Sequence, residues 1–182
     1  NWETGLFNGE GRAYGSELSL CYSSGKIHAA LYYTLSWNER KFVELYPYWF
    51  KDRFDNRHKI TLTGEMQINK NININACWTF HSGNRITVPE HIVTRPDNTT
   101  ELLFSEPYNA KIPDYHRLDI SCNFSKTTRN GNLRIWCISL YNAYCHLNPI
   151  MMRTTFDNNN KATASVYSLI PIIPSVSYSL IF

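Results

Sequence analysis

Strict alternation of apolar and polar residues near the carboxy-terminal end is the feature that most constrains the fold. Between residues 175 and 182 the apolar positions are Val176, Tyr178, Leu180 and Phe182, and the polar positions are Ser175, Ser177 and Ser179; only Ile181 breaks the pattern. Side chains of a β-strand alternate between two faces, so this pattern predicts a strand with one apolar and one polar face. The segment alone fits a transmembrane β-barrel and a soluble β-sandwich equally well.

Six further segments show strand-like alternation and bring the expected number of strands to seven. They span residues 12–22, 27–38, 59–68, 72–80, 117–125 and 132–144. The seventh segment runs from about 162 to 182, and Pro171 and Pro174 within it predict a bulge or a break in the hydrogen-bond ladder. Residues 132–144 are apolar on both parities, so the sequence does not assign their faces.

Alternation also predicts which side chains share a face in the centre of the chain. The expected apolar face holds Ile60, Leu62, Met66, Ile72, Ile74 and Trp78, and the expected polar face holds Thr61, Thr63, Asn73 and Asn75. Glu65, Gln67, Arg117 and Asp119 are expected on the polar face as well, where cross-strand polar pairing is the favoured interpretation over contact with a substrate.

The connections between these segments alternate in length. Residues 23–26, 69–71 and 126–131 are short and rich in turn-forming residues, whereas 39–58 and 86–116 are long. This rhythm is typical of an up-and-down transmembrane barrel, while loops of such length are uncommon in compact soluble domains. Aromatic residues near segment ends fit the girdles of such a barrel: Tyr14, Trp37, Trp78, Phe80 and Tyr178.

Composition is consistent with an all-β protein of one domain. The chain has 182 residues, 14% of them aromatic and only 18% charged, below the roughly 25% typical of soluble domains. No apolar run approaches the ~18 residues of a membrane-spanning helix. The net charge is +3, and no basic stripe is visible along the sequence, so nucleic-acid binding is not expected.

One stretch of the first long connection is the candidate ligand-binding surface. It contains Tyr46, Tyr48, Trp49, Phe50 and Arg53. Aromatic faces and a guanidinium can hold a ligand, although packing of the loop on its neighbours is the favoured interpretation. The nearby charges Asp52, Arg53, Asp55, Arg57 and His58 predict a solvated loop base or a salt-bridged patch rather than a catalytic cluster.

Metal and catalytic signals are weak. The five cysteines (Cys21, Cys77, Cys122, Cys137 and Cys145) form no C-x-x-C pair and predict no disulfide framework, although Cys122 and Cys137 flank one turn and are expected to be close. The six histidines lack ligand spacing, and Cys145 and His146, as neighbours on a strand, should point to opposite faces. No nucleophile or dinucleotide motif occurs, so we expect neither an enzyme nor a cofactor.

Six local strings, taken in order, carry a resemblance to a known family. They are GRAYGSEL (11–18), YYTLS (32–36), RFDNRHKI (53–60), YHRLDI (115–120), SLYNAY (139–144) and PIIPSVSYS (171–179). Together they resemble the C-terminal part of a TonB-dependent receptor, and the alternation that ends on an aromatic residue resembles the C-terminal signature of bacterial outer-membrane β-barrels. The resemblance covers nearly the whole chain.

The resemblance implies an all-β fold in which residues 1–182 supply about seven strands of a 22-stranded, antiparallel transmembrane barrel. The plug domain is absent from this chain, and its start at Asn1 without a signal sequence suggests a processed, trimmed or partial polypeptide. The implied place is the outer membrane of a Gram-negative bacterium. The implied function is TonB-dependent uptake of a nutrient such as a metal chelate (a siderophore complex), a vitamin or an oligosaccharide.

The implied partners are outer-membrane lipid, the rest of the barrel and its plug, the TonB complex acting through that plug, and a small nutrient ligand. Two alternatives remain open at this point. One is a small outer-membrane barrel that acts as an enzyme or adhesin, against which an odd number of strands argues. The other is a soluble ligand-binding β-domain.

Overall fold

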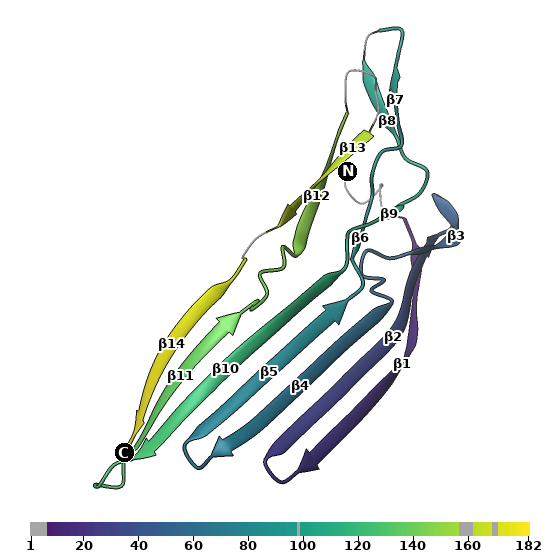
Figure 1. Cartoon of the computed structure of the whole chain (residues 1–182). Coiled ribbons are helices and arrows are strands. Elements are labelled where there is room, and N and C mark those ends of the chain that lie inside the picture. The colour runs from purple at the N-terminus through teal and green to yellow at the C-terminus, as the bar shows by residue number, and fades with distance from the viewer. Residues whose placement is uncertain (1–6, 98, 157–161, 169–170) are drawn as a thin grey trace.

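Seven long antiparallel strands form a meander in the computed structural model, which describes residues 7–97, 99–156, 162–168 and 171–182 (Figure 1). In their order across the sheet they are β1 (Gly9–Ser24), β2 (Ile27–Phe42), β4 (His58–Asn69), β5 (Ile72–His81), β10 (Tyr115–Thr127), β11 (Leu133–Tyr141) and β14 (Ile173–Ile181). Each strand pairs with the next in an antiparallel register. The prediction of seven alternating strands is confirmed, and no helix occurs among the described residues.

Short turns lie at one end of the sheet and long connections at the other (Figure 1). We call these the turn end and the loop end. Turns of two residues join β1 to β2 and β4 to β5, and Gly25 in the first of them has a φ of 56°, a conformation that favours glycine. The two predicted long connections both leave from the loop end.

The long connections contain short strands of their own. In the first, β3 (Tyr46–Lys51) pairs with β2. In the second, β6 (Arg85–Ile86) pairs with β9 (Ala110–Lys111), and β7 (His91–Thr94) pairs with β8 (Thr100–Leu103). A third long connection, between β11 and β14, carries the hairpin of β12 (Pro149–Phe156) and β13 (Ala162–Ser168).

This third connection corrects the sequence-based prediction of one interrupted strand from 162 to 182. The break is complete, because β13 pairs only with β12 while β14 pairs with β11. Strand β11 likewise ends at Tyr141 rather than 144, since Asn142 and Cys145 adopt positive φ angles of 54° and 56° and turn the chain away. Pro174 is tolerated inside β14 because this strand lies at the edge of the sheet.

The register places the two kinds of side chain on opposite faces of the sheet. Rows of directly opposed residues run across the strands, for example Leu20, Leu31, Leu62, Trp78 and Leu118 on one face. The other face carries a row that crosses all seven strands, formed by Ser23, His28, Glu65, Asn75, Ser121, Ser139 and Ser175. We call these the apolar face and the polar face.

The predicted shared faces are therefore confirmed for the centre of the chain, and the undecided strand now has an assignment. Register with β10 and β14 puts Trp136, Ile138 and Leu140 of β11 on the apolar face, and Ser139 and Tyr141 on the polar face. Local alternation could not decide this, because Ile135 and Leu133 are apolar residues on the polar face.

The polar face is hollowed into an open trough of about 730 Å³ that is lined by residues from all seven strands. The sheet therefore curves around its polar side. Among the described residues, β1 and β14 each have one unpaired edge, so the sheet is open and does not close into a barrel. No helix in the described part of the chain is long and apolar enough to cross a membrane.

Candidate functional site

The trough on the polar face is lined mainly by small residues, and polar side chains on the same face of the sheet bond to one another. Asn73 donates to Glu65 at 2.6 Å and to Gln67 at 3.1 Å, and Asn75 donates to Asn73 at 2.7 Å. Nearer the edge, the hydroxyls of Ser139 and Ser175 lie 2.6 Å apart. Cross-strand polar pairing, the interpretation favoured from the sequence, is what the structure has at Glu65 and Gln67.

A charged cluster centred on Arg117 marks the loop end of the trough. The Arg117 guanidinium donates to Asp119 at 2.8 Å, to the hydroxyl of Tyr115 at 2.9 Å and to that of Tyr141 at 2.5 Å. Asp119 also accepts a hydrogen bond of 3.0 Å from the backbone N–H of Asn142, where the third long connection begins. The cluster therefore ties that connection to the sheet and leaves Arg117 and Asp119 neutralised by each other.

The predicted ligand-binding stretch lies on and just after β3, and the structure separates its members. Phe50 is 4% exposed and packs against Phe42, Tyr46 and Tyr108, with ring centroids 6.0, 5.6 and 6.4 Å away. With so little of its side chain exposed, Phe50 has almost no surface that a ligand could contact. Phe50 and Tyr46 thus form the packed centre of the first long connection, as the packing interpretation requires.

Other members of the stretch face outward to different degrees. Trp49 is covered by the guanidinium of Arg12, 4.2 Å from its ring, and Arg12 also pairs with Glu39 at 2.7 Å. Tyr48 is 45% exposed, and Arg53 is exposed beside the ring of Phe54. The ligand-binding role stays a prediction, and Tyr48 and Arg53 are the residues with accessible surface for it.

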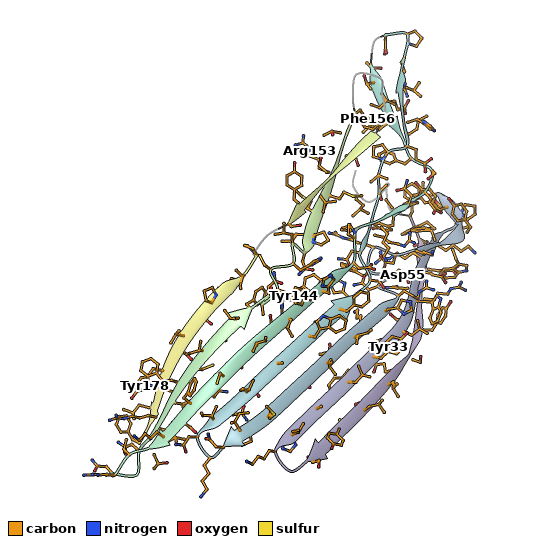
Figure 2. All side chains as sticks on the ribbon, in the orientation of Figure 1. Tyr33, Asp55, Tyr144, Arg153, Phe156 and Tyr178 are labelled. Carbon is orange, nitrogen blue, oxygen red and sulfur yellow. The ribbon has the colours of Figure 1, made fainter. Side chains whose placement is uncertain are left out.

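The charged residues that follow β3 are salt-bridged and partly buried at the base of the loop, so the structure has the pairing of one expected arrangement and the place of the other. Asp55 is 6% exposed, pairs with Arg57 at 3.1 Å and Arg85 at 4.0 Å, and accepts the backbone N–H of Asn38 at 3.1 Å. Asp52 is similarly buried and pairs with Arg40 at 2.8 Å. Figure 2 shows Asp55 where β3 and the second long connection meet the sheet.

One carboxylate of the second long connection has a perturbed pKa. Partial burial of Asp114 opposes its ionisation, but the ammonium of Lys111 at 2.5 Å and the backbone N–H of Gly83 at 2.9 Å outweigh that effect. The net result is a pKa below the usual 3.8. Gly83 is required here because a Cβ at this position would lie 1.7 Å from the carbonyl oxygen of Ile112.

Sequence reasoning missed a stacked histidine pair at the loop end. The rings of His116 and His146 have centroids 3.6 Å apart, and each ring has its own partner, Tyr144 at 2.8 Å for His116 and Asn148 at 2.9 Å for His146. The spacing of the histidines along the sequence did not predict this pair, because it is the third long connection that brings His146 to His116. The expectation that Cys145 and His146 alternate on a strand was wrong, since both lie in the irregular segment between β11 and β12.

Metal-ligating residues do not converge in threes anywhere in the part of the chain that the structure describes. All five cysteines are free thiols. The expectation that Cys122 and Cys137 are close neighbours across the hairpin is confirmed for their backbones. Cys122 is opposite Ile138 and Cys137 is opposite Asn123, so the two thiols occupy different faces of the sheet.

Comparison with known proteins finds no matching family model, no similar curated protein and no similar solved structure. The resemblance carried by the six strings therefore remains a hypothesis about function. What the fold defines is a class: an all-β protein with an open antiparallel sheet and one largely apolar, exposed face.

Proposed function

We propose that this chain is part of the wall of an outer-membrane β-barrel, and specifically the C-terminal part of a TonB-dependent receptor that takes up a nutrient. The observation that carries the proposal is the exposed apolar face, which continues without interruption over seven strands opposite a polar, concave face. Leu20, Leu62, Ile138 and Val176, which lie on four of those strands, are each 46–64% exposed. In a soluble protein such a face would need a cover, whereas lipid covers it in a barrel.

The height of the apolar face supports a membrane environment. On β2 it runs from Ile27 to Trp37, a span of ten residue-to-residue steps, which is roughly 34 Å along the strand and about 26 Å across a bilayer at a tilt of ~40°. That matches the band of ~25 Å found on outer-membrane barrels. Aromatic pairs lie near both limits: Tyr14 and Trp37 at the loop end, with centroids 5.4 Å apart, and Trp136 and Tyr178 at the turn end, 4.8 Å apart.

The open edges support the larger barrel. Unpaired N–H and C=O groups at β1 and β14 are too costly to leave in lipid, so a membrane sheet must close. The remaining strands of a 22-stranded barrel would supply that closure, and a plug domain would fill the trough on the polar side. In this arrangement the short turns face the periplasm and the three long connections face outward.

The receptor function follows from the resemblance and needs no catalytic group. The long connections would capture a small nutrient, such as a metal chelate, a vitamin or an oligosaccharide, and the plug would then rearrange under the action of the inner-membrane TonB complex. Tyr48 and Arg53, the exposed members of the predicted ligand-binding stretch, could contact the nutrient. The proposal includes no enzyme activity, no cofactor and no nucleic acid.

Tryptophan quenching tests the membrane assignment. Variants of the protein at its full natural length would each retain one tryptophan, either Trp136 on the apolar face or Trp49 on β3, with the others replaced by Phe. In vesicles that contain brominated phospholipid, Trp136 fluorescence should be quenched and Trp49 fluorescence should not. Equal quenching of both, or recovery of the protein in buffer without detergent, would favour the soluble β-domain instead.

Uptake assays test the transport assignment separately. Cells with and without the gene would be offered labelled ferric chelate, vitamin and oligosaccharide, with a protonophore to remove the energy supply of the TonB complex. Gene-dependent uptake that the protonophore abolishes is expected for one of the three. Membrane insertion without any such uptake would leave a barrel enzyme or adhesin as the better description.

A further inference from the structure

The turn end of the sheet carries an unpaired concentration of positive charge. Its cations are Lys26, Lys70, Lys126, Arg129 and Arg134, all exposed. Residues 23–28, 67–73, 124–135 and 180–182, which form this end, contain no Asp or Glu side chain, and the carboxyl end of the chain at Phe182 lies there too. The sequence shows no basic stripe, because these cations come from three turns that lie far apart along the chain and only the meander brings them to one end.

Two of these cations are opposed in the sheet with no anion between them. Lys126 of β10 lies directly opposite Arg134 of β11, and like charges in this position destabilise a strand pair. Neither side chain takes part in any ion pair or hydrogen bond among the described residues. Folding has therefore placed an unfavourable pair at a position where nothing in this part of the protein neutralises it.

The pair occupies a defined place relative to the apolar face. Register and alternation put Lys126 and Arg134 on the apolar face itself, one row beyond Phe124, Trp136 and Tyr178. Tyr178 is seen near the turn end of β14 in Figure 2. Two cations just past an aromatic row mark the level of phospholipid headgroups, and the aromatic rings beside them offer a surface to the first methylenes of an acyl chain.

We infer that Lys126 and Arg134 form a binding site for the phosphate of an anionic phospholipid in the leaflet at the turn end. This inference rests on the proposed function, since it requires the apolar face to lie in a bilayer. The phosphate would sit between the two cations and remove their repulsion, with the guanidinium of Arg134 as its fork-shaped donor and Lys126 as a point charge. Bound lipid would therefore stabilise the β10–β11 hairpin as well as its contact with the membrane.

Native mass spectrometry in detergent measures the dissociation constant of short-chain phosphatidylglycerol from the full-length protein. In the double variant Lys126→Gln/Arg134→Gln we expect this constant to rise by about thirtyfold, the combined effect of two cations near an anionic lipid surface. The matched control is Lys70→Gln/Arg129→Gln, which removes the same charge from the same end but from the turns, and it should change the constant far less. Phosphatidylcholine should bind all three proteins equally.

A charge reversal gives the second readout. Lys126→Glu supplies an anion opposite Arg134, so it should slow amide hydrogen exchange in the β10–β11 hairpin without added lipid and abolish the further protection that phosphatidylglycerol gives the wild type.

Equal dissociation constants for the two double variants would overturn the site. Displacement of the lipid by equimolar inorganic phosphate would overturn it too, by showing a site for free anions. If brominated lipid does not quench Trp136, the proposed function is wrong and the lipid site falls with it. If Trp136 is quenched, the dissociation constants and exchange rates test the lipid site alone.

Discussion

The seven-stranded sheet and the loop end differ in how much of each is buried and therefore in what stabilises them. Every side chain that is buried among the described residues lies at the loop end: Phe50, Ile112, Asp52, Asp55, Asn56, Ser82, Asn142 and Asn148. The seven strands of the sheet bury none, although they carry most of the large apolar residues. The loop end is therefore stabilised by its own packing, and the sheet by its ladder together with whatever covers its two faces.

The two regions also handle polar groups differently. On the sheet, polar side chains form short cross-strand chains that stay partly open to solvent. At the loop end, buried carboxylates pair with arginines and accept backbone N–H groups, as Asp55 does from Asn38. Long connections that fold on themselves in this way can keep a fixed shape of their own. In the proposed barrel they would lie outside the bilayer, and the sheet would depend on the membrane and on neighbouring strands.

The largest expected effect comes from isolating the sheet from its neighbours. The polypeptide 1–182 alone leaves the β1 and β14 edges unpaired, which lipid cannot satisfy and which invites aggregation in water. It should therefore give no heat-resistant, protease-resistant monomer in detergent, by gel mobility and far-UV circular dichroism. A stable monomer with full β signal would show that the sheet needs no further strands.

The next effect tests the independent packing of the loop end. Phe50→Ala should lower the local unfolding free energy of the β2–β3 segment by about 3–5 kcal/mol, because it opens a cavity among Phe42, Tyr46 and Tyr108. Hydrogen exchange of the β3 amides in the full-length protein reports this local opening. Tyr48→Ala, on the same strand but exposed, should cost less than about 1 kcal/mol. Similar losses at both positions would mean that β3 has no packed centre.

A somewhat smaller effect separates the two faces of the sheet. Ile120→Arg, midway along β10 on the apolar face, should cost about 2–4 kcal/mol in a bilayer. Its neighbour Ser121→Arg faces the trough and should cost much less. The measurement is equilibrium unfolding of the full-length protein in lipid vesicles. Equal costs at the two positions would contradict a lipid-covered apolar face.

The smallest effect concerns pH at the loop end. The pKa of Asp114 is lower when folded than when unfolded, so its ionised form stabilises the fold above about pH 3.8, and this contribution disappears as the pH falls through the folded value. Because the carboxyl is partly exposed, we expect less than about 1 kcal/mol. The protection factor of the Gly83 amide, which is its exchange rate corrected for the intrinsic pH dependence of exchange, should therefore fall on acidification, and Asp114→Asn should remove that dependence. An unchanged pH profile in the variant would assign the effect to another group.

Local alternation was sufficient to predict most of the sheet. In β1, β2, β4, β5 and β10 the apolar residues fall mainly on one parity. The positions of these strands and their shared faces could therefore be predicted from the alternation alone, and the short turns could be predicted from their Gly, Asn and Lys residues. The alternation of short and long connections also predicted that two of the three long connections lie at the same end of the sheet. The candidate stretch around Phe50 was found from its aromatic content, although composition could not tell a packed ring from an exposed one.

Contacts between segments distant in the chain decided the rest. The faces of β11 became definite only through its register with β10 and β14, and the break between β13 and β14 only through the pairing of β13 with β12. The stacking of His116 on His146 and the opposition of Lys126 and Arg134 are likewise products of the fold. The sequence by itself determined the period of each strand, because side-chain alternation is a local property of the backbone. Only the tertiary structure decided which strands pair and which charges lie opposite each other. Register depends on the neighbouring strand, and the local pattern of a single strand does not identify that neighbour.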